Sequence, residues 1–192
     1  MTGRRWRPNC EAPGPAEPGP RHTGRVDVTE LRARQAPLKE RYRNAPDSAR
    51  TPLSATADWR EPGITTTVDG WAAPVRAGLH PATGGDGADA CSGDMLLQAL
   101  LGCAGVTLRS VATAMRLDLE DVRLRADAFY DARGTLGLDR DVPVGIQDVV
   151  VAIEVRTDAD DAALARLAEL TERYCVVAQS LRERPQLVVR RL

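Results

Sequence analysis

The fold of this chain is decided by the stretch Asp94-Met-Leu-Leu-Gln-Ala-Leu-Leu-Gly-Cys103-Ala-Gly-Val-Thr-Leu-Arg109. Its apolar residues spread around nearly the whole circumference of a helix, and the helical pattern continues to about Arg116. A helix that is apolar on every side is typical of a protein interior. We therefore predict that residues 94–116 form a long central helix, buried on every side.

The segments before this helix predict a β-hairpin. Residues 53–59 alternate weakly between apolar and polar side chains, and residues 64–68 are β-branched. The residues between them, Arg60-Glu-Pro-Gly63, have the composition of a turn. Two short strands joined by such a turn form a hairpin.

After the long helix the pattern predicts two strands, a helix and a final strand. The strands are expected over residues 122–130, 149–155 and 187–191. The helix between the last two runs to about Tyr174, and either Asp158 or Asp160 can cap its start. This order predicts an α+β fold, a sandwich of sheet and helices without the βαβ alternation of a doubly wound protein.

Composition indicates one folded domain with additional sequence at the N-terminus. The chain has 192 residues, 43% of them hydrophobic, which is enough for a substantial core. Residues 1–24 are rich in Pro and Gly and are predicted to be disordered. Residues 25–50 predict a short helical extension, of one or two helices around Pro37, and residues 51–192 the folded domain.

Charge, hydropathy and cysteine content indicate which partners and which cellular location to expect. The formal net charge of −1 gives no reason to expect nucleic acid or a membrane surface as partner. The longest apolar run, from Met95 to Leu108, is interrupted by Gln98 and is too short for a bilayer span. Four cysteines without a secretory signal predict reduced thiols and a cytoplasmic location.

Cys103 and Cys175 are the candidate reactive residues, although a lone cysteine in an Ala/Leu-rich helix is most often inert. A reactive thiol must be acidified by its surroundings. Cys103 lies nine residues into the predicted helix, beyond the reach of the helix dipole. Arg109, six positions later and about 600° around the helix, faces elsewhere. A cation from another segment is therefore required, and the hairpin turn offers Arg60.

Other polar residues give weaker signals. His80 and Cys91 could contribute to a metal site, but two ligands without a recognised spacing are weak evidence for one. We therefore expect no metal and no cofactor.

Two motifs resemble the OsmC/Ohr family of peroxide-reducing proteins. The segment from Ser92 to Cys103, followed by Ala-Gly-Val-Thr-Leu-Arg, is similar to the family's long-helix motif, in which a carboxylate precedes an apolar run that ends in the peroxidatic cysteine. The segment Arg173-Tyr-Cys-Val-Val-Ala-Gln-Ser-Leu181 is similar to the second motif, which carries the resolving cysteine. The resemblance extends over about residues 50–192.

The resemblance implies a fold, an activity and roles for four residues. It implies an intertwined homodimer with thiol sites at the subunit interface, reduction of organic hydroperoxides, and recycling by a dithiol reductant, in many members a lipoylated protein. Carried over by position, Cys103 would be the peroxidatic and Cys175 the resolving cysteine. Asp94 would supply the carboxylate, and Arg60 would pair with the thiolate.

The chain also departs from the family pattern. The Ohr branch has Glu where this chain has Gly93, and Asp94 matches the carboxylate position of another OsmC-like branch. Val176 replaces the usual Pro after the second cysteine. Two hypotheses follow: a thiol-dependent peroxidase active against oxidative stress, or a non-catalytic OsmC-fold protein that binds an apolar ligand or senses redox state.

Overall fold

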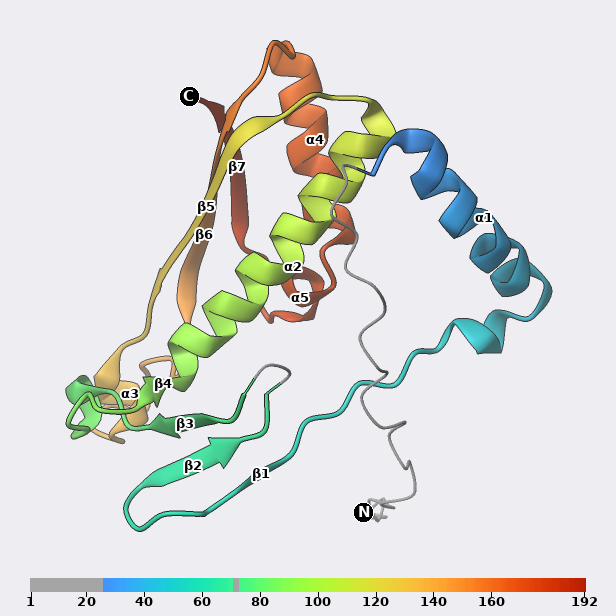
Figure 1. Cartoon of the computed structure of the whole chain (residues 1–192). Coiled ribbons are helices and arrows are strands. Elements are labelled where there is room, and N and C mark those ends of the chain that lie inside the picture. Colours follow the sequence, from blue (N-terminus) through green and yellow to red (C-terminus); the bar gives the residue numbers. More distant parts are fainter. Residues whose placement is uncertain (1–25, 71–72) are drawn as a thin grey trace.

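The computed structural model describes residues 26–70 and 73–192 of the chain, and Figure 1 shows their arrangement. A four-stranded sheet has the order β1-β2-β3-β4, with strands Ala57–Asp58, Thr65–Val68, Val75–Gly78 and Ala90–Cys91. A three-stranded sheet has the order β5-β6-β7, with strands Glu120–Phe129, Gln147–Arg156 and Gln186–Arg191. The α-helices are α1 (Val28–Asn44), α2 (Ser92–Met115), α3 (Ala132–Thr135), α4 (Asp161–Tyr174) and α5 (Val176–Ser180).

The hydrophobic core lies between the β5-β6-β7 sheet and the helices α2 and α4, which cover one face of that sheet (Figure 1). Strand β6 directs alternate side chains into the core, since Val151, Ile153 and Val155 are all fully buried. Helix α2 contributes its buried stripe at helical spacing, with Leu100 and Leu108 among its members. The α+β class predicted from the sequence is confirmed by this arrangement.

Helix α2 has one exposed face, so the prediction that it is buried on every side is wrong for the single chain. Its five buried residues form one stripe, whereas the side chain of Val106 is 74% exposed and that of Leu96 is 36% exposed. The reason is geometric, because the β5-β6-β7 sheet and α4 cover only one side of the helix. Apolar residues on the other side, Val106 above all, stay exposed among residues 26–70 and 73–192.

The length of α2 also corrects the argument against a membrane span. Its 24 residues are long and apolar enough to cross a bilayer by length and composition alone. The helix nevertheless packs into the core against β6 and α4, as the central helix of a globular domain does.

The structure refines several elements of the sequence prediction and decides between its alternatives. Strands β6 and β7 are parallel and are joined through α4 and α5, so the fold contains one βαβ unit where none was expected. Helix α1 is a single helix that continues through Pro37 and has no buried residue. Helix α4 is capped by Asp160, whose carboxylate accepts the N–H of Ala163 at 2.7 Å. The tail predicted to be disordered, residues 1–24, lies outside the described residues.

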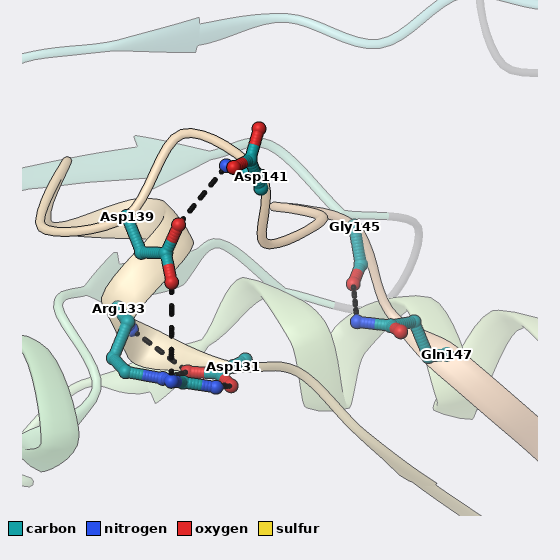
Figure 2. Close-up of polar contacts among 6 residues, drawn as sticks. All are labelled: Asp131, Arg133, Asp139, Asp141, Gly145 and Gln147. Carbon is teal, nitrogen blue, oxygen red and sulfur yellow. Dashed lines mark hydrogen bonds and ion pairs between the residues drawn. The ribbon is translucent and has the colours of Figure 1, made fainter.

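The connection between β5 and β6 is held together by one arginine. Figure 2 shows Arg133 on α3 against the carboxylate of Asp131, at 2.6 Å, and facing Asp139 at 4.0 Å. The next residue, Gly134, lies so close to the carbonyl oxygen of Val142 that a Cβ atom there would be 2.9 Å from it. This packing folds the connection back on itself before β6 begins.

Candidate functional site

Cys103 lies in the middle of α2, where the buried stripe meets the exposed face. Its side chain is partly buried and packs against the core cluster. The neighbours Gly102 and Val106 are exposed. Gly102 has no side chain, and a Cβ atom placed there would meet nothing within 4 Å. The Cys103 sulfur therefore lies at the edge of the core, beside a surface that a ligand can approach.

Cys175 lies at the break between α4 and α5 and is fully buried. Its own N–H donates to the carbonyl of Thr171 at 3.0 Å, which closes α4. Its backbone is extended, with φ −74° and ψ 104°, so the chain turns there before α5 begins. Cys175 is thus both the C-cap residue of α4 and the N-cap residue of α5.

The break brings the two thiols together. The side chains of Cys103 and Cys175 lie close enough for each to influence the pKa of the other, and neither forms a disulfide. The backbone N–H groups of Val177 and Val176, the first two of α5, also lower the pKa of Cys103. The first N–H groups of a helix have no partner within the helix, and α5 has no side-chain cap. These N–H groups are therefore available to stabilise a thiolate at Cys103.

The surroundings shift the pKa values of the two thiols in opposite directions. Burial acts most strongly on Cys103 and by itself would raise the pKa of this thiol. The hydrogen bonds from Val177, Cys175 and Val176, with a further one from the Thr107 hydroxyl, outweigh burial, so the pKa of Cys103 lies below that of an ordinary cysteine. Burial raises the pKa of Cys175 above that of an ordinary cysteine. The neighbouring Cys103 raises the pKa of Cys175 further, whereas the backbone N–H of Ala178 lowers it.

Arg60 is held by carboxylates of its own hairpin. Its guanidinium contacts Asp58 and Asp69, each at 2.6 Å. Both acids raise the pKa of Arg60, Asp58 most strongly. The strongest influences on the Cys103 sulfur are all neutral or come from the other thiol. Arg60 therefore remains a prediction as the cation of the site.

Asp94 lies in the first turn of α2 and is exposed. Nine residues of helix separate it from Cys103, which corresponds to about 13.5 Å along the axis and about half a turn around it. A carboxylate at this position cannot contact the sulfur of the same chain. The predicted role of Asp94, as the carboxylate of the thiol site, therefore requires that another residue or a second subunit bridge this distance.

His80 and Cys91 do not combine into a metal site in the described part of the chain. The Nδ1 atom of His80 accepts the N–H of Ala82 at 3.0 Å, and its ring packs edge-on against Tyr130. Cys91 precedes α2 as a free thiol. Within residues 26–70 and 73–192, no group of three or more His, Cys, Asp or Glu side chains is placed to hold a metal ion.

Sequence reasoning missed the neutral donors of this site. The two amides belong to α5, whose five residues are too few for a helical pattern to be recognised. The Thr107 hydroxyl could have been found, because a residue four positions after Cys103 lies on the same helix face.

Comparison with known proteins places the fold in one family. Residues 85–190 match the model of the family described as OsmC-like protein. The fold is similar to that of an OsmC-like protein from Mycoplasma pneumoniae, with 12% identity, a TM-score of 0.59, and coverage of 74% of this chain and 96% of that one.

Structures of two organic hydroperoxide resistance proteins are also similar. An organic hydroperoxide resistance protein from Elizabethkingia anophelis has 14% identity and a TM-score of 0.57, with coverage of 74% of this chain and 96% of that one. An organic hydroperoxide resistance protein OsmC from Legionella pneumophila has 15% identity and a TM-score of 0.54, with 74% and 98% covered. At such identities the likeness shows the fold alone. A comparison with curated proteins finds no significant match.

Proposed function

We propose that this chain, which belongs to the OsmC-like protein family, is a thiol-dependent peroxidase that reduces organic hydroperoxides. The observation that carries the proposal is the contact between Cys103 and Cys175, with the pKa of the first lowered and that of the second raised. A peroxidase of this type needs one thiolate to attack and one thiol held in reserve. The direction of the two pKa shifts supports Cys103 as the attacking thiol.

The reaction proceeds in three balanced steps. The Cys103 thiolate attacks the terminal oxygen of the hydroperoxide, the O–O bond breaks, and the alkoxide takes a proton to leave as the alcohol. Cys103 is now a sulfenic acid. Cys175 attacks its sulfur, water leaves, and a disulfide forms. A dithiol reductant then restores both thiols by exchange and is itself oxidised to a disulfide.

Oxidation of Cys103 also prepares Cys175 for its step. Burial is the main cause of the raised pKa of Cys175, but the charge of the Cys103 thiolate adds to it. A sulfenic acid at Cys103 carries no such charge. The pKa of Cys175 therefore falls once the peroxide has reacted, and Cys175 becomes nucleophilic when its target exists.

The surface around the thiols favours an organic substrate. Val176 is 63% exposed, and Val106, one helical turn after Cys103, is 74% exposed. Apolar side chains at the mouth of a site favour the hydrocarbon portion of an alkyl hydroperoxide over the small, polar hydrogen peroxide.

The same exposed residues support a homodimer as part of the proposal. Monomeric proteins rarely leave large contiguous apolar patches in water. The exposed face of α2 and the β1-β2 hairpin, with Trp59 89% exposed and Ile64 75% exposed, are surfaces that a second subunit would cover. A partner subunit could also bring Asp94 or Arg60 toward a sulfur that it cannot reach within one chain. Free thiols and a dithiol reductant suit the cytoplasm.

Turnover with two peroxides tests the proposal. The reduced protein is mixed with cumene hydroperoxide or hydrogen peroxide, with dihydrolipoamide as reductant, and compared with Cys103→Ser, Cys175→Ser and, as a matched control, Cys91→Ser. We expect preference for the organic peroxide, no turnover in Cys103→Ser, and wild-type turnover in Cys91→Ser. Absence of turnover with any dithiol, in a folded protein, would refute the peroxidase.

A second function, the binding of an apolar ligand without catalysis, is favoured by one groove. It has a volume of about 460 Å³ and lies between the first half of α2 and the start of β6. Leu97, Ile146, Val149 and Leu181 line it, with Arg182 at its side. Ligand binding that is unchanged in Cys103→Ser, together with no turnover, would support this function instead.

A further inference from the structure

Thr171 on α4 is the one fully buried polar side chain in the described part of the chain, and its hydroxyl has no hydrogen-bond partner there. A threonine in a helix usually donates to the carbonyl oxygen four residues earlier, as Thr113 does to Arg109 at 2.8 Å. Thr171 makes no such bond to Leu167. A buried hydroxyl without a partner destabilises a fold. The stability of the reduced protein therefore does not explain this residue.

Thr171 lies one helical turn before Cys175, and both side chains face the core. The N–H of Cys175 donates to the carbonyl oxygen of Thr171 at 3.0 Å, which is the bond of a regular helix. The φ of Cys175, −74°, is still close to the helical value, so its Cβ atom lies where a continuing α4 would place it. On one helix face, Cβ atoms four residues apart are separated by about 5–6 Å. Since both residues are 0% exposed, the hydroxyl and the sulfur share the same apolar surroundings.

The proposed reaction requires a negative charge in these surroundings. Cys175 attacks the oxidised Cys103 as a thiolate. Cys175 is a member of the hydrophobic core cluster, and Cys103 packs against that cluster. A thiolate in an apolar environment is costly unless hydrogen bonds support it. The thiol is a weak acceptor, whereas bonds to a charged acceptor are strong. A donor without a partner in the reduced protein therefore gains one when Cys175 loses its proton.

We infer that Thr171 is a positioning residue for Cys175, and that its hydroxyl donates to the Cys175 sulfur when the thiolate forms. This inference rests on the proposed function in that Cys175 is the resolving thiol. Rotation of the two short side chains brings the hydroxyl oxygen within hydrogen-bond reach of the sulfur. The bond stabilises the charge and holds the sulfur for its attack on Cys103. Thr171 has no partner in the reduced state because its partner exists only during the reaction.

An aromatic disulfide, dithiobisnitrobenzoate, tests this step without peroxide. The Cys103 thiolate attacks the reagent, one thionitrobenzoate leaves, and a mixed disulfide forms. Cys175 then attacks the Cys103 sulfur, a second thionitrobenzoate leaves, and the protein disulfide forms. In a chain that carries Cys10→Ser and Cys91→Ser, the other two cysteines are absent. The two phases of thionitrobenzoate release, followed by absorbance, then report Cys103 and Cys175 separately.

Thr171→Val removes the hydroxyl and keeps the shape of the side chain, Thr171→Ser keeps the hydroxyl, and Thr113→Val removes a hydroxyl that has a partner. We expect Thr171→Val to slow the second phase by about tenfold and to leave the first phase unchanged. Thr171→Ser and Thr113→Val should keep the wild-type rates of both phases. In urea denaturation, reduced Thr171→Val should be more stable than the wild type, because the unpaired buried hydroxyl is gone.

Each result decides the inference. A wild-type second phase in Thr171→Val overturns it, as do equal slowing of both phases and a Thr171→Ser variant as slow as the valine variant. Reduced Thr171→Val that is less stable than the wild type would also contradict it, since the hydroxyl would then be bonded before the reaction. Dithiobisnitrobenzoate needs no peroxidase activity, so a slowed second phase in a protein that turns over no hydroperoxide would support the role of Thr171 and refute the proposed function. If Thr171→Val does not fold, Thr171→Ala takes its place in the comparison of the two phases.

Discussion

Single residues of the site carry the difference in acidity between the two thiols. Because hydrogen bonds lower the pKa of Cys103 despite its burial, we expect its alkylation profile to lie at lower pH in the folded protein than in the unfolded one. Burial raises the pKa of Cys175, so its alkylation profile should lie at higher pH in the folded protein than in the unfolded one. Peptide mapping after alkylation at a series of pH values measures both. In urea the two profiles should coincide, and a Cys103 profile that lies at higher pH in the folded protein than in urea would contradict the assignment.

The sequence predicted these residues to different extents. Cys103 could be selected because its helix pattern is long and its motif resembles that of a known family. The ion-pair partners of Arg60 could not be predicted from the sequence, because Asp69 comes within reach of Arg60 only when β1 pairs with β2. Thr107 was visible in the printed sequence, but a hydroxyl four residues from a cysteine usually bonds to the backbone, so the spacing alone does not identify it.

At the scale of elements, the start of α5 determines the environment of Cys103. Val176 is the first residue of α5, a position that tolerates proline, and Cys175 before it already has the extended backbone that a following proline requires. Val176→Pro removes one N–H donor to the sulfur. We expect alkylation of Cys103 at pH 7 to slow by about twofold to tenfold. Val176→Ala, which keeps the N–H, should behave as wild type; equal rates in both variants would count against the amide contact.

The cap of α4 gives a prediction of stability with a built-in control. Asp160 accepts the N–H of Ala163, whereas Asp158 is an exposed neighbour outside the helix. Asp160→Ala is expected to lower the free energy of unfolding by about 1 kcal/mol. Asp158→Ala should change it by less than about 0.5 kcal/mol. Urea denaturation of the two variants measures the difference, and equal losses would show that Asp160 is not the effective cap.

Long elements were predictable and short ones were not, for physical reasons. The pattern over α2 spans more than six turns, and only its exposed face was misjudged, because hydropathy does not reveal whether a face is covered by the same chain or another. Strand β3, Val75–Gly78, has an exposed Arg76 paired with Glu61 and Asp89 and shows no clear alternation. Helix α5 is shorter than two turns. The element that completes the site was therefore the one least visible in the sequence.

For the whole molecule, the uncovered face of α2 predicts self-association. We expect a mass of twice 20.7 kDa in light scattering coupled to gel filtration. Val106→Arg places a charge on that face and should yield monomers, whereas Leu138→Arg, at an equally exposed loop residue, should remain dimeric. A monomeric wild-type protein would leave the exposed face unexplained and remove the partner subunit that Asp94 needs.

The most direct test of the account is to add one equivalent of cumene hydroperoxide to the fully reduced protein and to map the products by mass spectrometry. We predict a disulfide that joins the Cys103 peptide to the Cys175 peptide. In Cys175→Ser, we predict a sulfenic acid on Cys103 that dimedone traps. Oxidation that falls mainly on Cys91, or a Cys103 that stays reduced while peroxide is consumed, would contradict the account.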